Sequence, residues 1–318
     1  YSKANRTNID MTLKREKLQR YDDVAEIRDS VVSLQNTESR IAESQSSRER
    51  LVEEENEKII TDMSNENISI KFVDVSAQIR GIASSLSLRD YYSLSIYYRI
   101  FIPELFPNVD KAIYLDSDTV VLEDIAELYG IDMGDNLVAA VQDMVVASEK
   151  VFRTYADMGV GVRYERYFNS GVLLMNLREM RLADLQGKFM HMLKTYHFDT
   201  ICPDQDYLNV ICKDKVHYLG TEWNKMSVDP SPCEKLRLIH YNMFFKPWLY
   251  SGVLYQEHFW NYAKASPFYA NIIRERDNFG DENKRRDAEA GDDLRRSAER
   301  ISKSDRNFRT MMFSEMTV

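Results

Sequence analysis

The amino-acid sequence predicts an α/β fold in which short buried strands form a sheet flanked by helices. Short and almost wholly apolar runs occur at 112–115, 120–122, 137–141 and 171–174, and polar or helical stretches separate them. A further run at 68–75 alternates and is rich in β-branched residues, which is typical of a strand. Because short strands that alternate with helices form sheets covered by those helices, the chain is placed in the α/β class.

The segment that precedes this domain, residues 1–66, is charged and contains neither proline nor glycine. We expect one or two long helices here, because apolar residues follow helical spacing at Val24, Ile27, Val31, Leu34 and Ile41. A coiled-coil partner and a helix packed on its own domain both fit this stripe, which breaks at Glu38.

The α/β domain is expected to span residues 67–276. Its later elements are a strand at 236–240 and a helix within the aromatic stretch 250–269. Residues 277–318 carry densely mixed charges, for which we expect a solvated helical tail. Its end, 308–318, is apolar enough to dock on a neighbouring molecule or a membrane surface. The N-terminal helices and this tail are the expected routes of any self-association.

The composition is that of a folded globular chain with an acidic balance. Of its 318 residues 44% are hydrophobic, and the formal net charge is -9. This charge disfavours a nucleic-acid partner, since affinity for phosphate backbones rests on clustered Lys and Arg. No run of about 18 apolar residues is present to cross a bilayer. Three cysteines without a C-x-x-C pair predict reduced thiols and hence a cytoplasmic protein, free or peripheral to a membrane.

The residues that most clearly carry chemistry are Asp116, Ser117 and Asp118, which follow the apolar strand predicted at 112–115. Two carboxylates separated by one residue both reach one cation when the chain turns, and oxygen ligands suit Mg²⁺ or Mn²⁺. Such pairs also serve as turn or cap residues. The strand favours the metal interpretation, because the carboxyl ends of buried strands are where open α/β sheets hold ligands.

A family resemblance extends this interpretation beyond one acidic pair. Five segments carry it, in order along the chain: Tyr97–Leu105, Tyr114–Thr119, Tyr167–Asn176, Asp204–Asn209 and His240–Trp248. Together they resemble the family 8 glycosyltransferases, the retaining group that contains bacterial lipooligosaccharide galactosyltransferases and glycogenin. The resemblance covers about residues 68–269. It implies a GT-A-like, Rossmann-type mixed sheet flanked by helices.

The resemblance also implies a metal site. Asp116 and Asp118 would bind Mn²⁺, with Mg²⁺ as the other candidate, and would bridge it to the diphosphate of a UDP-sugar donor. His240 would complete the ligand set, which agrees with the preference of mixed nitrogen and oxygen ligands for Mn²⁺ over Ca²⁺. Lys246 would place a point charge on the leaving phosphates. For a lone histidine a structural imidazole is the ordinary expectation, and the position of His240 in the segment that ends at Lys246 favours the metal role instead.

Further donor contacts follow from the same resemblance. Arg99 would hold the donor diphosphate or the sugar hydroxyls, and a surface salt bridge is its alternative role. Asn169, Asp204 and Gln205 would line the sugar, because acceptors paired with amide donors fix hydroxyl orientation. Gln205 would lie near the anomeric carbon. Because no carboxylate nucleophile is obvious, the resemblance implies front-face retaining transfer to a glycan or glycoprotein acceptor.

The sequence departs from the family in two places. Members begin with a strand of the kind Val-Val-Phe-Ala-Ala-Asp-Asp that holds uracil and ribose, and we do not find it here. A rebuilt N-terminus, missing upstream sequence and a domain without efficient catalysis each explain this departure. Between His240 and Lys246 the chain has Tyr-Asn-Met-Phe-Phe, where many relatives carry glycine.

Three functions therefore compete. The first is a retaining hexosyltransferase that moves glucose or galactose from a UDP-sugar. The second is an inactive relative that acts in assembly or scaffolding, which the missing first strand favours. The third is a nucleotide-sugar hydrolase that uses water as the acceptor. The joint presence of Asp116, Asp118, His240, Lys246 and Gln205 favours the first.

Overall fold

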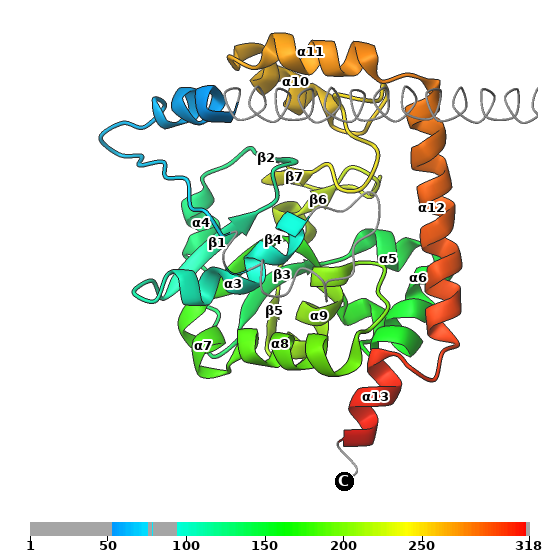
Figure 1. Cartoon of the computed structure of the whole chain (residues 1–318). Helices are drawn as coiled ribbons and strands as arrows, with labels where there is room; N and C mark the ends of the chain where they lie inside the picture. Colours follow the sequence, from blue (N-terminus) through cyan, green and yellow to red (C-terminus); the bar gives the residue numbers. More distant parts are fainter. Residues whose placement is uncertain (1–52, 76–77, 79–93, 316–318) are drawn as a thin grey trace, which may run out of the picture. The chain divides into compact units, whose positions relative to one another are not determined.

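A computed structural model of the chain describes residues 53–75, 78 and 94–315 (Figure 1). The chain forms two compact units, residues 1–74 and 75–318. Residues 53–61 of the first unit are helical. The apolar stripe from Val24 to Ile41 lies outside the described residues, so the long N-terminal helices stay a prediction.

The strand expected at 68–75 is wrong. These residues have no regular secondary structure, and the side chains of Ile68, Phe72 and Val73 are 53%, 49% and 50% exposed. A strand needs a partner for its backbone N–H and C=O groups, and no β-ladder joins this segment to any other described residue. The alternation of apolar and polar residues at 68–75 was therefore not sufficient evidence for a strand.

The main sheet confirms three of the predicted apolar strands. Its order is β1 (Lys111–Leu115), β4 (Phe168–Asn176), β3 (Val138–Gln142) and β5 (Val216–Tyr218). β4 is antiparallel to both β1 and β3, whereas β3 and β5 are parallel, so the sheet is mixed. All but the last residue of β4 are buried, because the strand lies between two others and under helices on both faces.

A second, smaller sheet lies at the end of β1. It contains β2 (Thr119–Val121), β7 (Leu238–His240) and β6 (Lys225–Met226), in that order. β2 and β7 are antiparallel with Thr119 opposite His240, and β6 runs parallel to β7. The chain passes from the main sheet into the second one through residues 116–118. The acidic turn is therefore held between two sheets, with His240 at its side.

Helices cover both faces of the main sheet (Figure 1). Residues of α3 (Tyr98–Leu105), α7 (Leu177–Leu182), α8 (Leu185–Tyr196) and α9 (Pro203–Cys212) form one core with Val138, Ala140, Leu173 and Met175. The alternate strand residues Ala139, Val141, Val172 and Leu174 pack with α4 (Ile125–Tyr129) and η5 (Thr221–Trp223). Burial on both faces explains why these strands are apolar throughout.

The remaining described elements lie around this body. They are the 3₁₀-helix η2 (Leu94–Tyr97), α5 (Met144–Ser148), α6 (Lys150–Thr154), the π-helix η3 (Tyr155–Val160), η4 (Tyr164–Arg166), α10 (Gln256–Ala265), α11 (Tyr269–Asn278), α12 (Asp281–Ser302) and α13 (Phe308–Glu315). α10 confirms the helix expected in the aromatic stretch, and β7 confirms the strand expected at 236–240.

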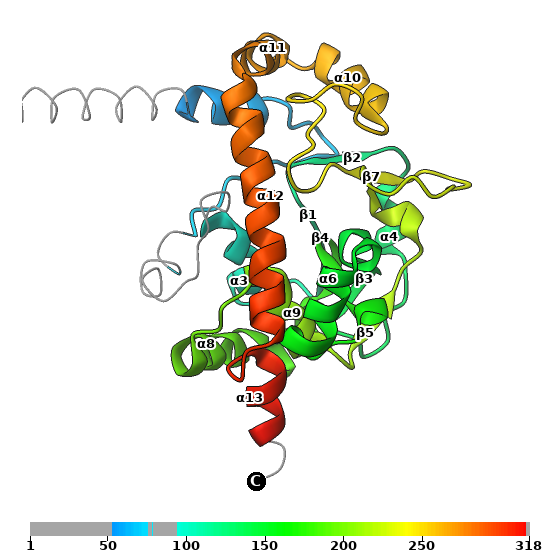
Figure 2. The same cartoon turned by 90° about the vertical axis from the view of Figure 1, so that its right-hand side faces the viewer.

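The charged tail is helical as predicted, but it is not wholly solvated. α12 runs beside α6 and η3 (Figures 1 and 2), and Leu294, Ala298 and Ile301 are buried there. Arg295 of α12 also forms a two-pronged ion pair with Glu149, with N–O distances of 2.9 and 3.0 Å. The predicted division at residue 277 stays a prediction, although the tail lies in the same compact unit as the α/β body.

The start of α13 packs on the chain's own core. Phe308 is 1% exposed, and its ring lies edge-on to Tyr207 with the centroids 5.0 Å apart. Met311 and Met312 pack partly against the same core. The apolar character of this segment is therefore explained up to residue 312 without a neighbouring molecule or a membrane.

Candidate active site

A cavity of about 680 Å³ opens where β1, β4 and β7 meet. Every site residue predicted from the sequence lines it: Arg99, Asp116, Ser117, Asp118, Asn169, Asp204, Gln205, His240 and Lys246. An apolar end is formed by Val146, Phe152, Ile201, Met243, Phe244 and Leu294, the last from α12. The cavity therefore has a polar end and an apolar end, as small-molecule sites usually do.

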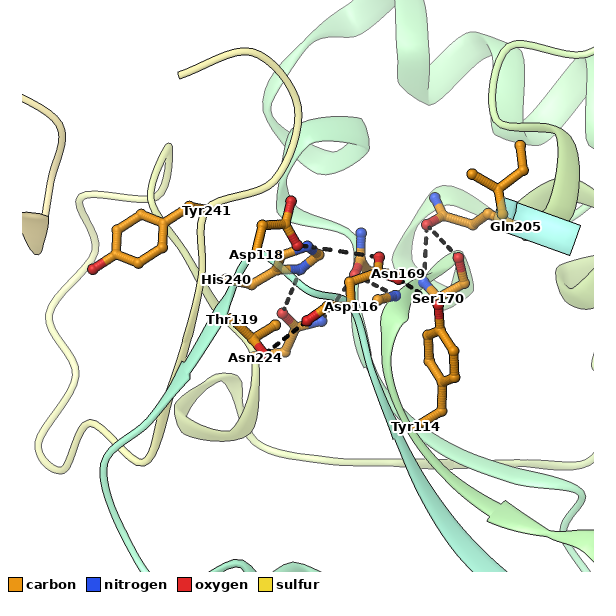
Figure 3. Close-up of polar contacts among 12 residues, drawn as sticks. Tyr114, Asp116, Asp118, Thr119, Asn169, Ser170, Gln205, Asn224, His240 and Tyr241 are labelled. Carbon is orange, nitrogen blue, oxygen red and sulfur yellow. Dashed lines mark hydrogen bonds and ion pairs between the residues drawn. The ribbon is translucent and has the colours of Figure 1, made fainter. Parts of the chain in front are cut away.

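The acidic turn is fixed by backbone contacts. The Asp116 N–H donates to the Gly171 carbonyl at 2.8 Å, and the Thr119 hydroxyl donates to the Asp116 carbonyl at 2.9 Å. The Tyr241 N–H donates to the Asp118 carbonyl at 2.9 Å. Main chain on both sides of the turn is thus held, which directs both carboxylates toward His240 (Figure 3).

Asp116, Asp118 and His240 each offer a ligand atom, and these atoms lie within 4.8 Å of one another. His240 Nε2 is 3.2 Å from Asp118 Oδ1 and 3.9 Å from Asp116 Oδ2. Gly171 makes this approach possible, because a Cβ at that position would lie 2.2 Å from His240 Cε1 and 2.7 Å from Asp116 Oδ2. No side chain larger than hydrogen fits there.

These three side chains fit a divalent cation. Asp118 Oδ1 is buried and has no hydrogen-bond partner in the described part of the chain. A buried carboxylate oxygen without a partner is costly, and a cation held between it and an imidazole nitrogen would remove that cost. Oxygen ligands with one imidazole suit Mn²⁺ or Mg²⁺, and Mn²⁺ better.

Lys246 lies against the same carboxylate. It forms an ion pair with Asp118 and donates to the Tyr241 carbonyl at 2.6 Å. Burial opposes ionisation of Asp118, but the Lys246 ammonium beside the carboxylate holds its pKa below the usual range. Asp118 is therefore an anion across the physiological range, which a metal ligand has to be.

The segment after His240 has unusual backbone. Met243 has φ of 60°, in the left-handed region that glycine adopts at little cost and other residues rarely visit. This is the stretch where the sequence lacks the glycine that many relatives carry. The chain keeps a glycine-like conformation there and adds the Met243 side chain to the cavity wall.

Arg99 is buried rather than on the surface, so its alternative role as a surface salt bridge is wrong. Its Nη2 lies 2.8 Å from Asp116 Oδ1 and its Nε 3.1 Å from Asp204 Oδ2, while Nη1 donates to Ser170. Tyr114 also donates to Asp116 Oδ1, at 2.6 Å. Burial opposes the charge of Arg99, but the two carboxylates raise its pKa above the usual range. Arg99 therefore ties Asp116 to Asp204.

Asn169, Asp204 and Gln205 form a second polar group around Ser170 and Asp143. The Ser170 N–H donates to Gln205 Oε1 at 2.9 Å, and its hydroxyl donates to Asp204 Oδ2 at 2.9 Å. Asn169 and Gln205 each donate to Asp143 Oδ2 at 3.0 Å. Burial raises the pKa of Asp204, and Arg99 opposes that rise.

Sequence reasoning missed four residues of this site: Asp143, Ser170, Gly171 and Asn224 did not appear among the candidates. A signal existed for Asp143, because it directly follows an apolar strand as Asp116 does. Ser170 and Gly171 lay within a quoted motif, but their roles depend on which side chains the fold brings against them. Nothing local marks Asn224.

Asp206 anchors the start of the helix that carries Asp204 and Gln205. It is fully buried and accepts hydrogen bonds from Tyr167 at 2.6 Å and Tyr155 at 2.7 Å. Burial raises the pKa of Asp206 to about 7, although the two phenols oppose the shift. Because Tyr155 belongs to η3, Asp206 fixes α9 to that π-helix.

This pKa predicts a pH-dependent stability. The unfolded carboxyl ionises near the usual pKa of 3.8, whereas the folded one keeps its proton to about pH 7. The folded state therefore binds more protons between these values, and the free energy of unfolding falls as pH rises through this window. The fall is on the order of 4 kcal/mol, since one pKa unit corresponds to about 1.36 kcal/mol.

Urea unfolding of the parent and of Asp206→Asn at a series of pH values checks this prediction. The stability of the parent relative to the variant should decline from about pH 4 to about pH 7 and stay level above it. A relative stability that rises with pH would show that the phenol hydrogen bonds outweigh burial.

Comparison with known proteins identifies the family. The model of glycosyl transferase family 8 matches residues 9–252. The chain belongs to glycosyl transferase family 8. The resemblance carried by the five motifs is thus confirmed, and the match begins further toward the N-terminus than those motifs. Residues 9–52, where the family's first strand was not found, lie outside the described residues.

Curated family relatives include two bacterial glycosyltransferases. The chain is 31% identical over 180 residues to glycosyltransferase GlyE of Streptococcus pneumoniae, covering 52% of this chain and 40% of that protein. It is 29% identical over 182 residues to the lipopolysaccharide 1,2-glucosyltransferase of Escherichia coli, covering 52% of this chain and 53% of that protein. The chain thus spans about half the length of the curated relatives it matches, or less.

Solved structures confirm the GT-A-like fold. Galactosyltransferase LgtC, in complex with donor and acceptor sugar analogs, is 26% identical with a TM-score of 0.53, covering 63% of this chain and 76% of that one. The bifunctional glycosyltransferase WbbM is 28% identical with a TM-score of 0.51, and the match covers 58% of this chain and 38% of that one. Among the described helices of this family member, none is long and apolar enough to cross a membrane.

Proposed function

We propose that this family 8 protein is a metal-dependent retaining hexosyltransferase that moves glucose or galactose from a UDP-sugar to a glycan or glycoprotein acceptor. The observation that carries the proposal is the convergence of Asp116, Asp118 and His240 around Gly171, in a cavity that also contains Gln205. A scaffold has no use for a buried carboxylate oxygen left without a partner.

The diphosphate end of the donor would lie over the acidic turn. Asp116, Asp118 and His240 would hold Mn²⁺ or Mg²⁺, which would neutralise the negative charge that develops on the departing nucleoside diphosphate. Lys246 is placed to donate to the same phosphate oxygens after giving up part of its contact with Asp118. Asn242, whose buried Oδ1 has no partner among the described residues, lines this end too.

The sugar would lie beside Asn169, Asp204 and Gln205. The carboxylates of Asp143 and Asp204 accept from sugar hydroxyls, whereas the amides of Asn169 and Gln205 both donate and accept. All four line the cavity and are held by the hydrogen bonds around Ser170 and Asp143. Arg99, already bound to both acidic groups, would act by positioning Asp116 and Asp204 rather than by gripping the donor alone.

Transfer would proceed on one face of the sugar. The bond from the anomeric carbon to the phosphate oxygen breaks, a bond to the acceptor oxygen forms on the same face, and the acceptor proton passes to the leaving phosphate. Asp204 is bound by Arg99 and Ser170, which argues against its use as a nucleophile. Gln205 would lie near the anomeric carbon and stabilise its developing positive charge.

The acceptor would approach from the apolar end of the cavity, where Leu294 and Phe244 form part of the wall. We also propose a cytoplasmic location, supported by the three cysteines, Cys202, Cys212 and Cys233, which are not joined in disulfides in the described part of the chain.

Release of UDP from UDP-glucose and UDP-galactose tests the proposal. We expect release with Mn²⁺, less with Mg²⁺ and none above background with EDTA, and product glycan of retained anomeric configuration when a suitable acceptor is added. UDP release that no acceptor increases would favour the hydrolase. Absence of Mn²⁺-dependent UDP binding in calorimetry would overturn the enzyme proposal and favour a scaffolding role.

A further inference from the structure

Asn224 is a buried residue that no motif of the sequence singled out. It lies between η5 and β6, is 0% exposed, and contacts two members of the site (Figure 3). Its Oδ1 lies 3.0 Å from His240 Nδ1, and its Nδ2 donates to Asn169 Oδ1 at 3.0 Å. It therefore connects the imidazole to the polar group around the sugar position.

The direction of these hydrogen bonds is set by a backbone amide. The Gly171 N–H donates to the side-chain oxygen of Asn169 at 3.0 Å, and a backbone N–H is always a donor. The other end of the Asn169 amide faces Asp143 Oδ2 at 3.0 Å, which only accepts when ionised. Both contacts require the Asn169 oxygen to face Gly171 and Asn224.

The orientation of the Asn169 amide in turn fixes that of the Asn224 amide. Since Asn224 faces an acceptor on Asn169, its own NH₂ group must point there, and its oxygen must point to His240. An oxygen that faces Nδ1 requires Nδ1 to carry the proton. In the neutral ring Nε2 then has a free lone pair, and Nε2 is the nitrogen that faces Asp118 and Asp116.

We propose that Asn224 is a positioning residue that selects the metal-binding tautomer of His240. The inference rests on the metal site of the proposed function, and it assigns a role to a residue outside that site. Without Asn224 the ring would be free to carry its proton on Nε2 and donate to Asp118 Oδ1, 3.2 Å away. That contact would occupy both ligand atoms and compete directly with a cation.

The surroundings keep Asn224 in place. The next residue, Lys225, is fully buried, pairs with Asp229 at 2.6 Å and donates to the Ser231 carbonyl at 2.7 Å. Met226 pairs with His240 in the β6–β7 ladder. Asn224 directly precedes β6, whose register with β7 is fixed, so the hydrogen bond between Asn224 and His240 does not depend on a mobile loop.

Two substitutions separate tautomer selection from a merely structural role. Asn224→Leu removes the acceptor for Nδ1–H, and we expect Mn²⁺ affinity to fall about 10- to 100-fold, the usual effect of losing a partner behind a metal-bound histidine. Asn224→Asp keeps an oxygen opposite Nδ1 and loses the donor to Asn169 Oδ1, so it should bind Mn²⁺ more tightly than Asn224→Leu, as carboxylate partners of such histidines support metal binding. Calorimetry with Mn²⁺ and without a sugar donor measures both.

Asn307→Leu is the matched control. Asn307 is also buried, at 2% exposed, and its side chain donates to the carbonyls of Ile301, Ser304 and Met158. Its loss should lower thermal stability but leave Mn²⁺ affinity unchanged. Equal Mn²⁺ affinity in Asn224→Leu and the parent, or equal weakening in Asn224→Leu and Asn307→Leu, would overturn the proposal.

The tautomer itself is measurable without any metal. Two-dimensional NMR of the ¹⁵N-labelled parent distinguishes protonated from unprotonated ring nitrogens, and a His240→Gln variant assigns the signal among the five histidines. We expect His240 with Nδ1 protonated and Nε2 free, and a shift toward Nε2–H in Asn224→Leu. A parent that shows Nε2–H would overturn the proposal even if Mn²⁺ binds. If Mn²⁺ does not bind but the tautomer is as expected, only the proposed function fails.

Discussion

Asp118→Asn should lower the rate of sugar transfer by roughly a hundredfold or more and abolish most Mn²⁺-dependent UDP binding. The substitution keeps the shape of the side chain but removes the anionic ligand, and it places an amide where Asp118 Oδ1 faces His240 Nε2 at 3.2 Å. Removing one preorganised electrostatic group from an active site commonly costs about 10²–10³ in kcat. Calorimetry with UDP, with and without Mn²⁺, measures the binding loss, and UDP release measures the rate.

A second Asp→Asn substitution supplies the control. Asp135 also forms an ion pair with a lysine, Lys215, but both side chains are exposed. Asp135→Asn therefore makes the same chemical change and breaks the same kind of pair without touching the cavity, and UDP binding should be unchanged. If Asp118→Asn retains Mn²⁺-dependent binding equal to that of Asp135→Asn, the acidic turn is not the metal site.

The part of this site that could be predicted is the part with a local signal. Asp116 and Asp118 follow an apolar strand, and His240 and Lys246 share one motif. Asn224 has no such signal: it lies 16 residues from His240 and 55 from Asn169, and the fold brings the three together from the residue before β6, from β7 and from β4. A contact made by tertiary register cannot be read from spacing along one segment.

In the fold, too, the elements that could be predicted are those with a local sequence signal. Strands buried on both faces, such as β3 and β4, are predictable because nearly every residue must be apolar. β6 has two residues and β5 three, too few to establish any period. In α12 the buried residues are Leu294, Ser297, Ala298 and Ile301 within a highly charged helix, so the charged residues outweighed this stripe in the prediction of a solvated tail.

Arg99→Met is expected to have the largest effect on stability. The side chain is 4% exposed and lies between Asp116 and Asp204, with Nη2 and Nε at 2.8 and 3.1 Å from their oxygens. Replacing it with an apolar chain of similar length leaves two carboxylates facing each other with no countercharge. Breaking a buried ion pair from one side costs about 3–5 kcal/mol, because the remaining charge stays desolvated. Urea unfolding measures this loss.

The physical cause can be tested separately from the loss of packing. If the cost arises from uncompensated charge, adding Asp204→Asn to Arg99→Met should restore part of the stability, since the double variant buries one charge fewer. Arg295→Met, which breaks an ion pair with Glu149 in a half-exposed setting, should cost no more than about 1 kcal/mol. A double variant less stable than Arg99→Met would instead assign the loss to the packing of Arg99 against Tyr114, whose ring centroid lies 4.4 Å from the guanidinium carbon. Recovery in the double variant would mean that Arg99 stabilises the fold chiefly as the countercharge that joins the acidic turn to α9.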